Sequence, residues 1–146
     1  MNRTSTAVWH GTGKEGTGVV TTQSGAINNL PYSWKTRFGD ESGKSGTNPE
    51  ELIAAAHAGC FNMASAFQFA GAGFTPDELK TDAVLTMEQS GTAWSITKVL
   101  LKMQAKIPNI TEEKFQELAK AAKEGCPVSR LLKGTVDITL EATLVK

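Results

Sequence analysis

The sequence predicts an α+β fold, in which strands and helices are segregated along the chain instead of alternating regularly. Residues 134–145 alternate apolar and polar side chains, which is typical of a strand with one buried face. Residues 48–70 form an Ala-rich, almost uncharged run with a strong helix start. Residues 80–107 are predicted to form two long strands joined at Ser90-Gly91. We therefore expect sheets packed around a long central helix.

Length and charge suit one ordinary domain, which we expect to cover residues 1–146. The chain has 15 Lys and Arg residues against 15 Asp and Glu residues, so it has no basic field that would attract nucleic acid. Residues 1–7 lack the apolar core of a secretory signal, and polar side chains interrupt the central run. We therefore expect a cytoplasmic protein with no nucleic-acid partner and no membrane partner.

The amino-terminal strands are predicted to lie within residues 4–38. Thr4–His10 and Gly18–Gln23 are rich in Val and Thr and flank a glycine-rich turn, which predicts a hairpin. Tyr32–Phe38 alternates aromatic and polar residues, which predicts a third strand with Arg37 on the face opposite the aromatic rings. Residues 39–47 contain three glycines and no apolar residue, so we expect a mobile loop there.

The central helix has clear start signals. Asn48 can cap it, Pro49 suits its first position, and Glu50 and Glu51 complement the positive end of the helix dipole. Glu51 also has the spacing of a capping box. No charged side chain follows Glu51 until Asp77, so we expect the helix to be buried on most of its sides.

Residues 111–132 are predicted to form two further helices. Thr111 caps the first, which has an apolar stripe and ends at Gly125. Cys126 then occupies the capping position of a short helix, and Pro127 its first position. The strand at 134–145 closes the chain.

Cys60 lies near the middle of the central helix, and its neighbours on the helical wheel are mostly apolar. They are Ile53, Ala56, His57, Met63, Ala64 and Phe67. A small core residue is the ordinary interpretation of such a cysteine. In a reducing compartment, however, a pair such as Cys60 and Cys126 is more typical of catalysis, redox sensing or metal binding than of a permanent disulfide.

A reactive thiolate needs positive surroundings. Cys126 stands at a helix start, where free backbone N–H groups favour the thiolate. Cys60 would need a cation, and Arg37 is the best candidate among the three arginines. A unit charge about 4 Å away at an effective dielectric constant near 20 contributes roughly 4 kcal/mol before desolvation, enough to bring the pKa of a thiol below neutrality. The alternative is that Arg37 is an exposed strand residue.

Glu50 could orient Arg37, but it precedes Cys60 by ten residues, about 15 Å along a straight helix. If both belong to one site, we expect a symmetric dimer in which the central helices cross and Glu50 of one chain approaches Cys60 of the other. The alternative for Glu50 is a first-turn charge that serves only the helix dipole.

His57 precedes Cys60 by three residues and is its neighbour on the helix surface. It could act as the base of a Cys-His pair, or complete a zinc site with Cys60 and Cys126. Neither spacing is specific, and a histidine satisfied within the core is the favoured interpretation. A non-enzymatic protein that binds a metal or a small apolar ligand through these three residues is the alternative function.

Several motifs together resemble one family, that of osmotically inducible protein C (OsmC) and the organic hydroperoxide resistance proteins. They are Thr47-Asn48-Pro49-Glu50-Glu51-Leu52, Ala58-Gly59-Cys60-Phe61 and Gly125-Cys126-Pro127-Val128-Ser129. The resemblance covers nearly the whole chain, including Thr36-Arg37-Phe38, and matches the OsmC branch closely. In the hydroperoxide resistance branch the active-site arginine comes from an earlier loop. The assignment of the active-site role to Arg37 therefore depends on the chain belonging to the OsmC branch.

The resemblance implies an OsmC-like fold, with antiparallel sheets around a long buried helix, in an intertwined homodimer with active sites at the interface. It implies a thiol peroxidase in which Cys60 is the peroxidatic cysteine and Cys126 the resolving one. Arg37 and Glu50 would match the charged pair that holds the Cys60 thiolate. A Cys60 sulfenic acid would give a Cys60–Cys126 disulfide, which a dithiol reductant of the lipoyl or thioredoxin type would reopen.

The expected substrates are organic hydroperoxides and, more weakly, hydrogen peroxide, in defence against oxidative or osmotic stress. The apolar neighbours Phe61, Met63, Phe67 and Trp34 favour the organic substrates. This chemistry uses thiols alone, so we expect no cofactor and no metal ion.

Overall fold

The computed structural model describes residues 1–145, which fall into two compact units. The first is Met1–Leu52, and the second extends from Ile53 onward. No helix in the described part of the chain combines the length and the apolar character that crossing a membrane requires.

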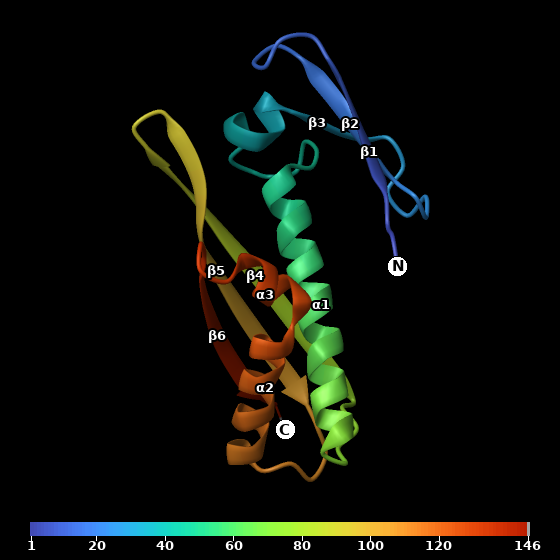
Figure 1. The fold of residues 1–146 in the computed structure, drawn as a ribbon, viewed down its shortest axis with the longest axis vertical. Helices are drawn as coiled ribbons and strands as arrows, with labels where there is room; N and C mark the ends of the chain where they lie inside the picture. Colours follow the sequence, from blue (N-terminus) through green and yellow to red (C-terminus); the bar gives the residue numbers. More distant parts are fainter. Residues whose placement is uncertain (146) are drawn as a thin grey trace. The chain divides into compact units, whose positions relative to one another are not determined.

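The first unit contains an antiparallel sheet of β1 (Ser5–His10), β2 (Thr17–Thr22) and β3 (Leu30–Ser33), in that order (Figure 1). The predicted amino-terminal hairpin is confirmed. Gly18 is required in β2 because the rings of Trp9 and Tyr32 pack over it, with their centroids 5.3 Å apart. A Cβ atom at Gly18 would lie 2.6 Å from the Tyr32 ring.

The predicted third strand, Tyr32–Phe38, is wrong beyond Ser33. The chain turns there into a short π-helical segment, η1 (Lys35–Gly39). Ser33 and Thr36 close the turn reciprocally: the Ser33 N–H donates to Thr36 Oγ1 at 2.9 Å, and the Thr36 N–H donates to Ser33 Oγ at 3.1 Å. Such local side-chain bonds compete with strand pairing. The aromatic residues Trp34 and Phe38 are four apart, a spacing that fits a helical turn as well as a strand.

The predicted loop at 39–47 contains no regular helix or strand after η1, apart from an isolated bridge at Thr47. Asp40 organises it by accepting hydrogen bonds from the backbone N–H groups of Ser42, Lys44 and Ser45. Bonds from the Ser42 and Ser45 side chains and backbone hold the pKa of Asp40 well below its usual range. The mobility of the loop stays a prediction.

The central helix α1 (Pro49–Gly71) begins as predicted. Asn48 caps it, since its Oδ1 accepts from the Glu51 N–H at 2.8 Å. The Glu51 carboxylate accepts from Thr47 Oγ1 at 2.9 Å, so it bonds to the residue before the cap. The start of the helix is therefore tied to the loop that precedes it.

The second unit contains the sheet β4 (Glu78–Ser90), β5 (Ala93–Lys106) and β6 (Asp137–Leu144), in that order. The β4–β5 pair is antiparallel, but β6 runs parallel to β5, so this sheet is mixed and the expectation of purely antiparallel sheets needs correction. The parallel pairing is possible because α2 (Glu112–Gly125) and α3 (Pro127–Leu132) form a long connection between β5 and β6. Both helices lie close to their predicted bounds.

The core of the second unit lies where α1 and α2 meet the sheet (Figure 1). β5 contributes alternate buried side chains, namely Val99, Leu101, Met103 and Ala105. The buried stripe of α1 recurs every four residues, at His57, Phe61, Ser65 and Phe69. Met63 and Phe67 on α1 are 65% and 74% exposed, so the prediction that this helix is buried on most sides is wrong for a single chain. A stripe of one residue per turn leaves the other faces of the helix uncovered.

Candidate active site

The two cysteines meet in the second unit. Both are free thiols, and the Cys60 side chain lies near enough to that of Cys126 for the two thiols to interact. The backbone N–H of Val128, in the first turn of α3, also donates to the Cys60 sulfur. Residues that are 66 positions apart in the sequence, Cys60 and Cys126, are thus brought into contact.

Cys126 is held by the junction between α2 and α3. Its N–H donates to the carbonyl of Ala122 at 2.9 Å, which closes α2, and its carbonyl accepts from the Arg130 N–H at 2.9 Å, which opens α3. Its side chain makes no capping hydrogen bond. The capping position predicted for Cys126 is therefore confirmed, and the thiol is directed into the protein with 0% exposure.

Cys60 is half-buried and lines a cavity of about 350 Å³. The other lining residues are mostly apolar and come from α1, α2 and the start of α3. They are Met63, Ala64, Phe67, Gln68, Ala122, Gly125 and Pro127. Because Cys126 is fully buried, a molecule that enters this cavity from solvent meets the Cys60 sulfur first.

The surroundings within the second unit keep Cys60 protonated. Burial raises the pKa of the Cys60 thiol, and the neighbouring Cys126 raises it further. The Val128 N–H acts in the opposite direction, because it stabilises the thiolate. A reactive thiolate at Cys60 therefore requires positive charge beyond these neighbours.

Arg37 and Glu50 meet in the first unit. Arg37 Nε lies 3.1 Å from each carboxylate oxygen of Glu50, and Nη2 lies 2.6 Å from Oε1. The guanidinium also lies over the Phe38 ring, 5.0 Å from its centroid. Such a two-pronged contact fixes the plane of the guanidinium. Glu50 and Arg37 are thus in direct contact, with the arginine carried by η1 and not by a strand, and their role in a site stays a prediction.

His57 is fully buried, and its Nε2 lies 2.7 Å from the Oγ of Ser129. Its Nδ1 has no hydrogen-bond partner among residues 1–145, so the interpretation of a satisfied core histidine holds for only one ring nitrogen. Burial lowers the pKa of His57, which favours the neutral ring. Within the same residues, no three or more His, Cys, Asp or Glu side chains are grouped so that they could hold a metal.

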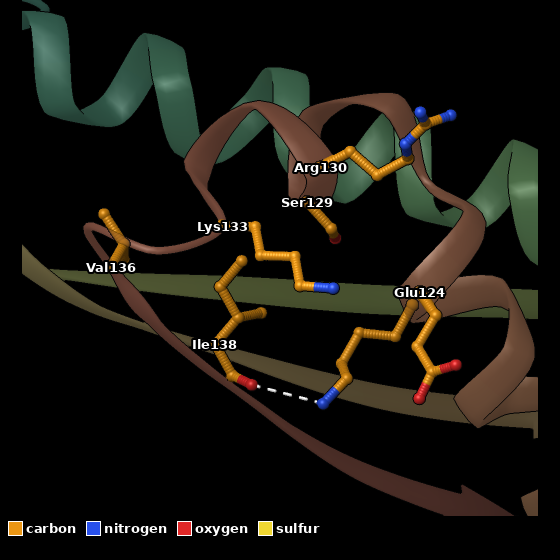
Figure 2. Close-up of a pocket in the computed structure, with 7 residues that line it drawn as sticks. Glu124, Ser129, Arg130, Lys133, Val136 and Ile138 are labelled. Carbon is orange, nitrogen blue, oxygen red and sulfur yellow. Dashed lines mark hydrogen bonds between the residues drawn. The ribbon is translucent and has the colours of Figure 1, made fainter.

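The sequence did not single out Ser129 by itself. It lies three residues after Cys126 in the first turn of α3, but nothing in the local pattern indicates a histidine partner 72 residues away. Figure 2 shows that Ser129 also faces a second cavity, of about 300 Å³. That cavity is bordered by Lys123, Glu124, Arg130 and Lys133, with Val136 and Ile138 from the chain leading into and along β6.

A comparison with family models matches residues 39–141 to the family described as OsmC-like protein. The chain belongs to the OsmC-like family. The matched segment contains Cys60 and Cys126 and begins after Arg37. The family resemblance carried by the cysteine motifs is therefore confirmed.

Curated OsmC-like relatives extend the match. The peroxiredoxin OsmC of Escherichia coli is 42% identical over 144 residues, which cover 99% of this chain and 97% of that protein. The organic hydroperoxide resistance protein OhrB of Bacillus subtilis is 34% identical over 102 residues, covering 69% and 73% of the two chains. These relatives support the OsmC branch of the family.

The OsmC-like fold is also shared with solved structures. The crystal structure of Bacillus subtilis OhrB superposes with a TM-score of 0.71 at 29% identity, and the match covers 96% of this chain and 98% of that one. The expected α+β class and OsmC-like fold are thereby confirmed, whereas the homodimer stays a prediction.

Proposed function

We propose that this protein is a cysteine-based peroxidase that reduces organic hydroperoxides and, more weakly, hydrogen peroxide. The contact between the Cys60 and Cys126 thiols, of which only Cys60 faces a cavity, is the observation that carries the proposal. The names of its relatives, a peroxiredoxin and an organic hydroperoxide resistance protein, support the same chemistry. Protection against oxidative or osmotic stress is the corresponding role.

In the first step the Cys60 thiolate attacks the terminal oxygen of the peroxide. The S–O bond forms as the O–O bond breaks, and the departing alkoxide takes up a proton to leave as an alcohol. Cys60 is then a sulfenic acid, oxidised by two electrons. The half-buried position of Cys60 beside an open cavity supports its role as the first sulfur to react.

In the second step the sulfur of Cys126 attacks the sulfur of the Cys60 sulfenic acid. The S–O bond breaks, the oxygen leaves as water with the proton of Cys126, and a disulfide remains. The proximity of the two thiols supports this step, since disulfide formation requires the two sulfurs to approach each other. Full burial of Cys126 protects it from direct oxidation.

The proposed source of positive charge is the Arg37–Glu50 pair of a second chain in a homodimer. The raised pKa of the Cys60 thiol supports the need for such a charge. The two-pronged contact between the Glu50 carboxylate and Arg37 supports a fixed direction for the guanidinium. Exposed apolar side chains on α1, at Met63 and Phe67, are of the kind that a second chain covers.

Reduction of the disulfide needs a dithiol, which opens it in two exchange steps and itself becomes oxidised. The overall reaction converts a hydroperoxide and a dithiol into an alcohol, water and a disulfide. We propose a lipoyl or thioredoxin type of reductant and action in the cytoplasm, where dithiols are kept reduced. The apolar lining of the cavity supports the preference for organic hydroperoxides.

The test is steady-state reduction of cumene hydroperoxide by the wild type, Cys60→Ser and Cys126→Ser, with dihydrolipoamide, thioredoxin or glutathione as reductant. We expect Cys60→Ser to be inactive. Cys126→Ser should consume about one equivalent of peroxide per chain and then accumulate a trappable sulfenic acid. Titration of free thiols in the wild type should show that one equivalent of peroxide removes two thiols per chain.

Retention of full activity in Cys60→Ser, with its loss in Cys126→Ser, would reverse the proposed roles. A wild type that consumes no peroxide with any of the three reductants, although its thiols are reduced, would overturn the peroxidase proposal.

A further inference from the structure

The contact between His57 and Ser129 lies beside the two cysteines but has no part in the proposed chemistry. His57 precedes Cys60 by three residues, so both lie on neighbouring positions of the same face of α1. Ser129 follows Cys126 by three residues and Val128 by one in the first turn of α3. The hydrogen bond of 2.7 Å between His57 and Ser129 therefore joins α1 to the turn that carries Cys126 and Val128. These two residues are the neighbours that interact with the Cys60 thiol.

Burial of the His57 ring costs free energy that packing alone does not require. His57 is fully buried, and its Nδ1 has no partner in the described part of the chain. A donating Nε2–H leaves only the lone pair of Nδ1 unpaired, which is the less unfavourable arrangement for a neutral ring, since unpaired buried N–H groups are rarer than unpaired acceptors. An apolar side chain at position 57 would avoid this loss, so the retained bond to Ser129 points to a positional role.

The hydrogen bond to His57 links Ser129, and with it the first turn of α3, to α1. Ser129 also lines the charged cavity of Figure 2. α3 itself has only six residues, Pro127–Leu132, and the Cys126 side chain makes no capping bond. Short helices have little intrinsic stability, so a buried link to α1 has a large share in fixing where the first turn of α3 lies.

We propose that the His57–Ser129 hydrogen bond is a positioning device for the disulfide step, which holds Cys126 against Cys60 after Cys60 has become a sulfenic acid. This inference depends on the proposed peroxidase function and adds His57 and Ser129 to it as positioning residues. Disulfide formation competes with a second peroxide, which attacks the waiting sulfenic acid and oxidises it to sulfinic acid. A looser first turn of α3 slows only the first of these two reactions.

The experiment compares full-length wild type with His57→Leu, His57→Gln and Ser129→Ala. Leu fills a similar volume without a hydrogen bond, whereas the amide of Gln can reach Ser129 and is the conservative rescue. Each reduced protein is mixed with cumene hydroperoxide, and stopped samples are analysed by intact mass for disulfide and sulfinic acid. The oxidation of Cys60 itself is followed separately in the Cys126→Ser background.

We expect disulfide formation to slow about tenfold in His57→Leu and Ser129→Ala, the change that the loss of one hydrogen bond of ordinary strength produces. The sulfinic acid fraction at a given peroxide concentration should rise accordingly. Oxidation of Cys60 should stay within about twofold of the wild-type rate, because no catalytic group is removed. His57→Gln should restore most of the disulfide rate.

The proposal is overturned if His57→Leu and Ser129→Ala form the disulfide at the wild-type rate, or if they slow both oxidation steps equally. Failure of His57→Gln to exceed His57→Leu would also overturn it. If position 57 does not tolerate Leu, Ser129→Ala and Ser129→Thr carry the same test, since Thr keeps the hydroxyl. A wild type that forms no disulfide at all would instead refute the proposed function.

Discussion

The regions around Cys60 and Arg37 contrast in charge and in surroundings. The side chains that line the cavity at Cys60 carry no charge, and burial raises the pKa of its thiol. Arg37, in the first unit, is 37% exposed and is held on two sides by the carboxylate of Glu50. The sulfur region contains a thiol that favours the protonated state, and the arginine region contains an oriented positive charge.

The proposed homodimer would make the activity depend on assembly. A thiol whose pKa is raised is protected from adventitious oxidation, because the thiolate is the reactive form. Bringing an oriented guanidinium from a second chain to Cys60 would activate the thiol only in the dimer. Glu50 would fix the direction of the charge while it offsets part of its strength.

Removal of the arginine charge is expected to have the largest effect. In Arg37→Gln we expect the rate of Cys60 oxidation at pH 7 to fall roughly tenfold to 100-fold, because the lost Coulomb energy lowers the fraction of Cys60 that is thiolate. A more basic thiolate is also more nucleophilic, which offsets only part of this loss of rate. Stopped-flow measurement of the first turnover gives this rate directly. Raising the pH should recover part of it, because deprotonation then no longer needs the charge.

A mixture of two variants shows whether the Arg37–Glu50 pair acts on Cys60 of its own chain or on Cys60 of the partner chain. When Arg37→Gln and Cys60→Ser chains are unfolded, mixed and refolded, about half of the dimers are mixed, and each mixed dimer contains one intact site if the charge comes from the partner. We then expect about a quarter of the wild-type activity per chain, beyond the residual activity of Arg37→Gln. Activity no higher than that residual level would place the arginine beside the cysteine of its own chain.

The turn that carries Arg37 should be sensitive to Thr36. Its Oγ1 accepts from the Ser33 N–H and lies 2.9 Å from the Thr47 carbonyl, to which it donates. We expect Thr36→Val, which keeps the shape and loses these bonds, to lower the free energy of unfolding by about 1–2 kcal/mol. Urea unfolding measures this loss, and Thr36→Ser is the control that keeps the hydroxyl. Equal stability of Thr36→Val and wild type would show that the bonds contribute nothing net.

Removal of an apolar side chain from the Cys60 cavity is expected to have a smaller effect than the changes above, and to act on substrate preference. Phe67 lines this cavity and is 74% exposed in the single chain. We expect Phe67→Ala to lower kcat/KM for cumene hydroperoxide about fivefold, since it removes roughly 1 kcal/mol of apolar contact with the substrate, and to change that for hydrogen peroxide little. Val84→Ala, at an exposed apolar position on β4, is the matched control. Parallel losses with both peroxides would argue against substrate contact by Phe67.

The sequence predicted most elements because their signals are local. Asn48 and Thr111 cap the helices that begin after them, and the alternation in residues 134–145 matches β6. The segment after Ser33 was predicted wrongly because a spacing of four between Trp34 and Phe38 satisfies both a strand and a helical turn. The side-chain bonds of Thr36 decide between them, and periodicity does not report such bonds.

Long-range pairing limited what the sequence could predict of the site. The motifs around Cys60 and Cys126 were sufficient to nominate both sulfurs, and the structure brings the two side chains near each other. The partnership of His57 with Ser129 depends instead on how α3 packs against α1, 72 residues later in the chain. The parallel pairing of β6 with β5 was likewise not visible, since alternation reports a buried face and not the neighbouring strand.

The smallest expected effect concerns pH and His57. Burial lowers the pKa of His57 in the folded protein below its ordinary value of 6.5. As pH falls below 6.5, the unfolded chain therefore binds a proton that the folded chain excludes, and the free energy of unfolding decreases. The contribution is fully present above pH 6.5 and is lost by at most about 1.4 kcal/mol per pH unit below it. Urea unfolding at a series of pH values should show a shallower slope for His57→Gln than for wild type between 6.5 and the folded pKa. Identical slopes for the two proteins would mean that the buried ring is protonated as readily in the folded chain as in the unfolded one. The full burial of the ring, and the absence of a partner for Nδ1 among residues 1–145, argue against that outcome.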